Sequence, residues 1–195
     1  MTMDRPKGKP PPEKKRMQLT PEQVIRKRRQ RLADKADIHS FFFKLAALAV
    51  LLAVLFGVVF GITPMPNDSM SPRLSAGDLI LYYRLADRWS INEVMVFQKD
   101  GELYVGRVVA RGGDTVEITE YATLVVNGST VIENDIYYST PRYDSDVTYP
   151  VTLADGEYFI LCDQRQGAKD SRYFGAVSES ETLGKVITVV RRSGL

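Results

Sequence analysis

One serine of this chain stands in a setting that would suit a nucleophile. Ser69 lies in the segment Pro66-Asn-Asp-Ser-Met-Ser-Pro72, between two prolines and seven residues after the end of a long apolar run. A serine hydroxyl attacks a carbonyl group only when a base takes its proton, and that base is usually a histidine or a lysine of lowered pKa. The chemistry open to Ser69 therefore depends on the bases that the chain offers.

The bases are few. The single histidine, His39, precedes the apolar run, whereas Ser69 follows it, so a Ser-His-Asp triad is excluded if the run crosses a membrane. Arginine stays protonated in proteins and cannot act as the base. The remaining candidates after residue 62 are Lys99, Lys169 and Lys185, each of which also fits an ordinary surface charge.

The composition argues against several other kinds of site. Cys162 is the only cysteine, so no intrachain disulfide can form, and with a single histidine in the chain we predict no metal site. No glycine-rich loop of the phosphate-binding kind is present. Residues 1–40 carry twelve Lys or Arg against five Asp or Glu, whereas residues 41–195 carry fourteen against nineteen. An acidic body argues against nucleic acid as a partner, and we expect no cofactor.

The apolar run predicts a membrane anchor. Eighteen apolar residues follow one another from Leu45 to Ile62, and with Phe41 to Phe43 and a snorkelling Lys44 the segment 41–62 reaches the roughly 20 residues that a spanning helix needs. The basic flank places residues 1–40 in the cytoplasm and residues 63–195 outside. A cleaved secretory signal fits less well because the basic region is too long, and a buried core helix because the run has no polar face.

The basic flank has two parts. Residues 1–20 are rich in proline and lysine and are expected to be disordered. Thr20-Pro-Glu-Gln23 is typical of a helix start, which predicts a basic helix from Pro21 to about Asp37. This helix either docks on anionic lipid of the bilayer or is a solvated extension of the anchor.

The segment 63–195 shows the short apolar runs and turn residues of a mostly β domain. We predict an antiparallel sheet or barrel-like body in which Lys99 to Glu102 and Asn127 to Ser129 form hairpin turns and residues 134–149 make an irregular excursion. The predicted strands are Leu79 to Arg84, Val94 to Gln98, Leu103 to Arg111, Thr115 to Thr119, Leu124 to Val126, Thr130 to Glu133, Tyr158 to Cys162 and Leu183 to Arg191.

Three segments, in this order behind an anchor, together resemble the bacterial type I signal peptidases, membrane-bound serine peptidases with a Ser/Lys dyad. The first is Pro66-Asn-Asp-Ser-Met-Ser-Pro-Arg-Leu-Ser-Ala-Gly-Asp78. The second is Tyr104-Val-Gly-Arg-Val-Val-Ala-Arg-Gly-Gly-Asp114, and the third is Cys162-Asp-Gln-Arg-Gln-Gly-Ala-Lys-Asp-Ser-Arg-Tyr-Phe-Gly175. The resemblance spans about residues 45 to 190, and three ordered segments of this kind argue against an unrelated anchored β domain.

The resemblance implies roles for individual residues. Ser69 matches the nucleophile, but Gly106 falls where the family has its lysine base. Ala168 falls on the family serine that hydrogen-bonds that lysine, so the base and its partner are missing together. Asp170 and Arg172 match a pair that supports the site from below.

The resemblance also bears on the oxyanion hole. Its donors would be the Ser69 backbone N–H and a side chain two residues earlier, here Asn67. An asparagine amide can donate such a bond. Asn67 also fits a simple turn.

Two functions remain open from the sequence. One is an active signal peptidase that cuts exported preproteins through Ser69, with Lys99 or Lys169 as a non-standard base, although neither lysine is well placed by spacing. The other is a non-catalytic relative that binds exported or pilin-like surface proteins, as do signal-peptidase-like accessory factors in pilin assembly. In the family an exposed sheet edge pairs with the extended substrate, and that mode needs no base.

Overall fold

The structure, a computed structural model, describes residues 20–133 and 136–191. These residues form two compact units, divided between Ala49 and Val50. The segment expected to be disordered, residues 1–20, lies outside the described residues except for Thr20.

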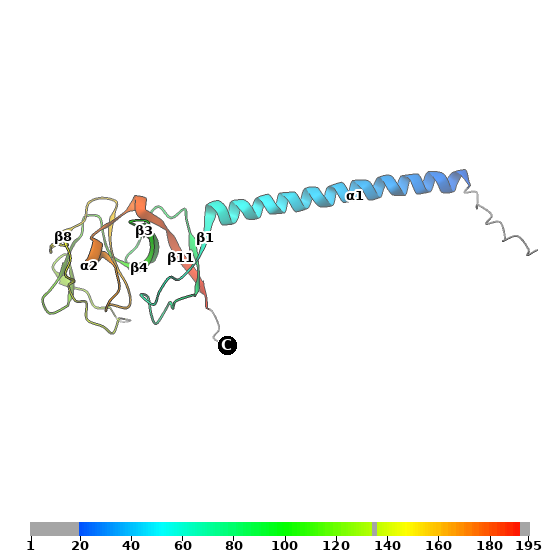
Figure 1. Cartoon of the computed structure of the whole chain (residues 1–195). Coiled ribbons are helices and arrows are strands. Elements are labelled where there is room, and N and C mark those ends of the chain that lie inside the picture. Colours follow the sequence, from blue (N-terminus) through cyan, green and yellow to red (C-terminus); the bar gives the residue numbers. More distant parts are fainter. Residues whose placement is uncertain (1–19, 134–135, 192–195) are drawn as a thin grey trace, which may run out of the picture. The chain divides into compact units, whose positions relative to one another are not determined.

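A single long helix contains the predicted basic helix and most of the predicted anchor (Figure 1). Helix α1 runs from Pro21 to Val54 and continues as a π-helical stretch, Leu55–Val59. At its start the Thr20 N–H donates to the Gln23 side chain at 3.1 Å, as the capping pattern predicted. By length and composition, Pro21–Val59 is the one candidate membrane span among the described residues, and none of its most apolar stretch is buried in the protein.

The helix ends three residues before the predicted limit at Ile62. Residues Phe60–Pro64 instead form strand β1, which pairs antiparallel with β2 (Leu79–Tyr83). The close approach of the two strands needs Gly61, because a Cβ there would lie 2.1 Å from a ring carbon of Tyr82. An apolar count cannot separate the last turn of a helix from an apolar strand, which is why the sequence put this boundary too late.

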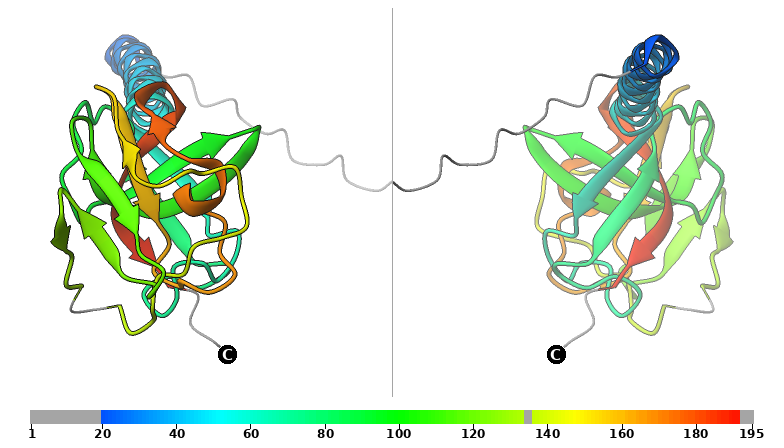
Figure 2. Two further views of the ribbon diagram at one scale, coloured as in Figure 1. Left: turned by 90° about the vertical axis from the view of Figure 1, so that its left-hand side faces the viewer. Right: turned by 90° about the vertical axis from the view of Figure 1, so that its right-hand side faces the viewer.

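The rest of unit 50–195 consists of two antiparallel sheets. The larger has the order β1-β2-β11-β3-β4-β9-β10 and the smaller the order β7-β6-β5-β8. The remaining bounds are β3 (Val94–Lys99), β4 (Glu102–Arg111), β5 (Thr115–Ile118), β6 (Leu124–Val126), β7 (Ser129–Thr130), β8 (Val151–Thr152), β9 (Glu157–Leu161), β10 (Val177–Ser178) and β11 (Thr182–Val190). In the right-hand view of Figure 2, β1, β2 and β11 lie side by side.

The predicted antiparallel β domain is confirmed, as open sheets and not as a closed barrel. Strands β1 and β10 are the edges of the larger sheet, and the described strands do not join them. Seven of the eight predicted strands are present, with ends that differ by at most one residue, whereas the predicted strand Thr130 to Glu133 is wrong beyond Thr130, because β7 ends there. Besides β1, the sequence missed the two-residue strands β8 and β10 and the short helix α2 (Ser171–Phe174), because elements this short carry no periodicity.

Both predicted hairpin turns are found. Asp100 and Gly101 have φ of 51° and 83°, and Asn127 and Gly128 have φ of 53° and 75°. These are the left-handed conformations that tight hairpins require and that Asn, Asp and Gly tolerate. The first turn joins β3 to β4 and thereby fixes the register that places Gly106 opposite Met95.

Strand β4 is the axis of the hydrophobic core. Its Val105 packs in the cluster that lies behind the Ser69 segment, its Val108 in a second cluster with Ile160, and its Ala110 in a third between the two sheets. The irregular excursion is also found, over the described residues 136–149. Its Tyr143 ring stacks on Arg172, 4.2 Å from the guanidinium carbon. A strand that contributes to every cluster cannot move without disturbing the whole unit.

Candidate active-site cleft

Backbone hydrogen bonds fix the segment that contains Ser69. The Met65 N–H donates to the Asp78 carbonyl at 2.7 Å and the Gly77 N–H to the Met65 carbonyl at 2.9 Å, which closes residues 65–78 into a compact loop. The Ser69 carbonyl accepts from the Gln164 N–H at 2.9 Å. The first and third sequence segments are thereby joined at Ser69.

Ser69 is half-buried and opens into a cleft of about 380 Å³. The cleft is formed by residues of all three segments and of β4, namely Asn67, Asp68, Ser69, Glu102, Tyr104, Gln164, Gln166, Gly167, Ala168 and Lys169. Ser69 and Ala168 thus lie in one cleft. Most of the lining residues have polar side chains, and the amides among them can hydrogen-bond the backbone of an extended peptide.

Asn67 takes up the backbone N–H that an oxyanion hole would use. The Ser69 N–H donates to Asn67 Oδ1 at 3.0 Å. Asn67 acts here as an acceptor that closes a turn, which is the second of the two roles that the sequence left open. In this arrangement the Ser69 N–H is engaged within the protein.

Gly106 lies on β4 with the space beside it already filled. A Cβ at this position would lie 2.5 Å from Ile160 Cγ2 and 3.4 Å from the Leu161 carbonyl oxygen. Ile160 is fully buried, and a separation under 3.0 Å requires something to shift. The side chain of Ile160 therefore occupies the space that the first atoms of a longer side chain at position 106 would need.

The other lysines that the sequence proposed as bases have partners elsewhere. Lys99 Nζ forms an ion pair with Glu181 at 2.8 Å and donates to the Ala176 carbonyl at 3.2 Å. Lys185 pairs with Glu93. Lys169 does line the cleft, but its ammonium lies over the Tyr173 ring, 5.3 Å from the centroid. Across residues 20–133 and 136–191, no lysine nitrogen hydrogen-bonds the Ser69 hydroxyl.

The neighbour of Ser69 that sequence reasoning missed is Cys162. Its thiol approaches the carbonyl oxygens of Val105 and Lys169, each at 3.7 Å, and it packs in one buried cluster with Met70 and Ala168. Burial, and then the negative charge of Asp170, raises the pKa of this thiol to about 12. A group of that pKa stays protonated at neutral pH and cannot take the serine proton. The signal was in the third segment, where the family pattern has glycine at this position.

Beneath the cleft lies a buried ion pair. Arg172 donates to Asp170 through Nε at 2.9 Å and Nη2 at 2.7 Å, and both side chains have no exposed surface. The same carboxylate accepts the N–H groups of Cys162 at 3.0 Å and Arg172 at 3.1 Å, and thereby caps α2. A carboxylate with four such bonds holds the third segment in place under Ser69.

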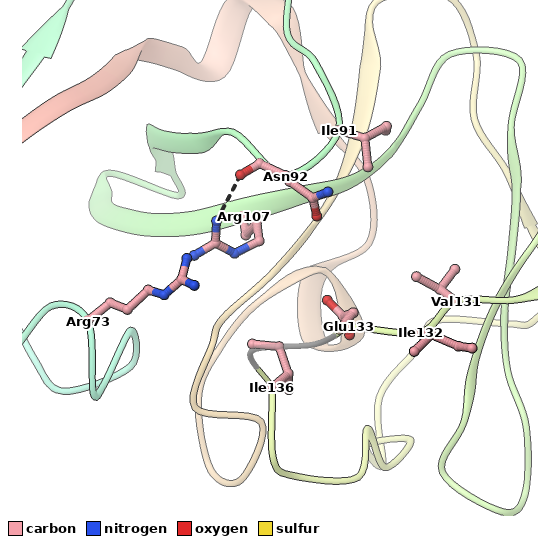
Figure 3. A pocket seen from close by; sticks show the side chains of 8 residues that line it. All are labelled: Arg73, Ile91, Asn92, Arg107, Val131, Ile132, Glu133 and Ile136. Atoms are coloured by element: carbon pink, nitrogen blue, oxygen red, sulfur yellow. Dashed lines mark hydrogen bonds between the residues drawn. The ribbon is translucent and has the colours of Figure 1, made fainter.

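A second ion pair ties the same loop to β4. Arg107 donates to Asp163 through Nε at 2.8 Å and Nη2 at 2.6 Å. Its third nitrogen donates to the Asn92 carbonyl at 2.8 Å, at the edge of a separate cavity of about 270 Å³ (Figure 3). That cavity shares no lining residue with the Ser69 cleft. Among the described residues, no group of three or more His, Cys, Asp or Glu side chains could hold a metal ion.

Comparison with known proteins gives a family for this arrangement. The family model described as "Signal peptidase, peptidase S26" matches residues 38–191. Signal peptidase IB of Staphylococcus aureus (strain COL) is 31% identical over 170 residues, which cover 78% of this chain and 88% of that protein. A probable signal peptidase I-2 of Synechocystis is 30% identical over 133 residues, and the chain spans 58% of the length of that relative and 62% of its own.

A solved structure was also found to be similar. It is a signal peptidase I from Enterococcus faecalis V583, which is 26% identical and matches with a TM-score of 0.44 over 52% of this chain and 98% of that one. The family match covers three quarters or more of the chain and includes all three sequence segments. The chain therefore belongs to the signal peptidase I family, peptidase S26.

Proposed function

We propose that this protein is a membrane-anchored signal peptidase I relative that holds a segment of an exported protein in the Ser69 cleft without cutting it at the rate of an active enzyme. The observation that carries the proposal is the glycine at position 106, where the family has its lysine base. The side chain of the family's base is absent, and Ile160 fills the space beside the glycine. Loss of a catalytic base from a serine protease costs several powers of ten in rate.

The placement of the protein follows from the same family. Its relatives are anchored in membranes, and the helix Pro21–Val59 is long and apolar enough to serve as the anchor. The excess of Lys and Arg before it would keep the N-terminal part in the cytoplasm by the positive-inside rule. The cleft would then face exported proteins on the outer side, and the proposed clients are preproteins or pilin-like surface proteins.

Binding without cleavage is consistent with the lining of the cleft. An extended peptide is held mainly through its backbone groups, and Gln164 and Gln166 offer amides for that purpose. These contacts do not depend on a base. The scaffold beneath the cleft, which includes the pair Asp170–Arg172, is complete.

The direct test is turnover of a fluorogenic signal-peptide substrate by the full chain in lipid nanodiscs. We expect the unmodified protein to match its Ser69→Ala variant, at the background rate. Serine-dependent turnover by the unmodified protein would sink the proposal. In that case Lys169, the lysine that shares the cleft with Ser69, is the base to test, and Lys169→Met should abolish the activity.

Binding needs its own measurement. Fluorescence anisotropy of a labelled signal peptide should show saturable binding to the full chain. Gln166→Trp, which fills the cleft, should weaken binding about tenfold or more, whereas Glu120→Trp, at an exposed site outside the cleft, should leave the affinity unchanged. Equal effects of both substitutions would place the peptide elsewhere.

A further inference from the structure

The charged groups of the Ser69 cleft differ in their partners. Three charged side chains line the cleft, namely the carboxylates of Asp68 and Glu102 and the ammonium of Lys169. Asp68 stabilises the loop that contains Ser69, because its Oδ1 accepts a backbone N–H of that loop at 2.8 Å. Lys169 lies over an aromatic ring of α2, with its ammonium 5.3 Å from the centroid. Two carboxylates against one ammonium leave the lining with an excess of one negative charge.

The Tyr104 hydroxyl fixes one oxygen of Glu102. It donates to Glu102 Oε2 at 2.7 Å. The Tyr104 ring is itself held in place, because its centroid lies 5.6 Å from that of Phe97, on which it stacks, and 5.3 Å from that of Phe174. Burial, and then the hydrogen bond to Glu102, raises the pKa of Tyr104 to about 12, so the phenol keeps its proton and remains a donor. The exposed carboxylate therefore has a defined position at the wall of the cleft.

No cation among the described residues pairs with this carboxylate. Lys99 lies directly opposite Glu102 in the register of β3 and β4, where side chains of opposite charge can stabilise a sheet. Lys99 is instead bonded to Glu181 and to the Ala176 carbonyl. In the part of the chain that the structure describes, none of the ion pairs includes Glu102, and its one hydrogen bond is to Oε2. Its second oxygen can therefore accept from a donor that enters the cleft.

We propose that Glu102 determines which peptides the cleft holds, and that its clients have a lysine or arginine side chain where the extended segment passes Glu102. The inference rests on the proposed function, because it names a chemical class of client for the same cleft. An ammonium or guanidinium that reaches the carboxylate supplies the cation that Lys99 does not, and it adds a charge-assisted hydrogen bond. An acidic side chain at the same point would be repelled.

This selectivity is measured by peptide binding. The full chain is placed in nanodiscs of phosphatidylcholine, which has no net charge, and titrated with the labelled signal peptide. The peptide is made with a single lysine at each position of its polar C-terminal part in turn, and in a matched series with methionine, which is uncharged. At one position or more, we expect the lysine peptide to bind at least about threefold more tightly than the methionine peptide, and this ratio to fall as salt is added.

Three variants assign the preference to the carboxylate. Glu102→Gln keeps the shape of the side chain and removes its charge, so the lysine and methionine peptides should bind equally well. Glu120→Gln makes the same change at an exposed site outside the cleft and should leave the ratio unchanged. Tyr104→Phe keeps the ring that packs on Phe97 but removes the hydroxyl that fixes Glu102, and it should lower the ratio.

The outcomes separate this inference from the proposed function. If the peptides bind but no lysine peptide exceeds its methionine counterpart, or if Glu102→Gln keeps the ratio, Glu102 does not determine the client and the proposed function stands. If no peptide binds with saturation, the proposed function fails together with this inference. Serine-dependent turnover by the unmodified protein would refute the proposed function and leave the preference for a basic side chain standing.

Discussion

The cleft around Ser69 and the layer beneath it differ in how completely their polar groups are used. In the layer beneath, Asp170 and Arg172 satisfy each other and two backbone N–H groups with no exposed surface. In the cleft, Ser69 keeps its place, but no lysine nitrogen among the described residues hydrogen-bonds its hydroxyl, and its N–H donates to Asn67. The polar groups beneath the cleft therefore contribute to stability. The cleft keeps a serine at the nucleophile position but has no base to activate it.

This difference indicates that fold and catalysis are separable in this chain. A buried ion pair is costly to break because the remaining charge has no partner, so its residues resist replacement for reasons of stability alone. A catalytic base contributes to rate and little to folding. A protein that keeps the first kind of residue and lacks the second can still present an ordered peptide cleft.

The largest effect is expected from a substitution in the ion pair beneath the cleft. Arg172→Ala leaves the Asp170 carboxylate buried without its partner and removes the ring contact with Tyr143, so we expect the free energy of unfolding to fall by about 3–5 kcal/mol. Denaturant unfolding of the full chain in detergent, followed by tryptophan fluorescence, measures this change. Trp89 is buried in the β domain and is the only tryptophan.

A matched control separates burial from charge. Arg142 faces Glu117 at 3.9 Å with both side chains more than 40% exposed, and it also donates to the Ile118 carbonyl and lies over the Tyr149 ring, so Arg142→Ala should cost about 1–2 kcal/mol, less than Arg172→Ala. If the two arginine variants lost equal stability, the lower layer would not be the supporting element described here.

A substitution at position 106, which does not line the cleft, gives a smaller effect. Gly106→Ala brings a Cβ against Ile160 Cγ2, and overpacking of this kind costs about 1–3 kcal/mol. In an Ile160→Ala background the same substitution should cost less by about 1 kcal/mol, because the opposing methyl groups are gone. A double-mutant cycle of unfolding free energies measures the coupling. Strict additivity would show that position 106 still has free space.

The pH dependence of the free energy of unfolding tests how completely the Cys162 thiol is buried. Burial raises the pKa of Cys162 from its ordinary 9.0 to about 12. The unfolded chain therefore releases this proton first, so the stability that the thiol contributes is complete below pH 9 and is lost as the pH rises from 9 to 12. Between pH 8 and 10 the native protein should lose about 1 kcal/mol more than Cys162→Ala. Parallel stability curves would mean that the thiol is accessible to water.

The half-buried tyrosines Tyr104 and Tyr149 titrate mainly above that pH window. Burial is the first cause that raises the pKa of Tyr149 to about 12, and burial followed by the hydrogen bond to Glu102 does the same for Tyr104. Their unfolded pKa is 10.0, so their contribution to the slope grows above pH 10. Both variants contain these tyrosines, and the difference between the two curves isolates the cysteine.

Much of the fold followed from local pattern. Strands such as Val94–Lys99 and Glu102–Arg111 have enough length for periodicity to show, and the Asp-Gly and Asn-Gly turns between strands fixed the hairpins. Phe60–Pro64 escaped prediction because its apolar residues continue the anchor without a break. Its pairing with β2 depends on contacts across the sheet, which no local window contains.

The site was predictable only in part, because it too depends on contacts between segments far apart in the sequence. The family pattern singled out Ser69, Gly106 and Ala168 because their positions align along the sequence. It gave no indication that Cys162, more than ninety residues from Ser69, would pack in one cluster with Met70 and Ala168, or that Ile160 would fill the space beside Gly106. Which side chain occupies a vacated volume is decided by packing across strands, not by the segment in which the vacancy arises.

The smallest expected effect is also the one that bears most directly on function. If the cleft holds peptide through backbone contacts, the Ser69 hydroxyl adds little to affinity. Ser69→Ala should then change the dissociation constant of a labelled signal peptide by less than about twofold, or ~0.4 kcal/mol. Anisotropy titration in nanodiscs measures it, with Gln166→Trp as the variant that must weaken binding. A large loss of affinity in Ser69→Ala would mean that the hydroxyl engages the peptide directly, and the contrast between an ordered scaffold and a silent serine would no longer hold.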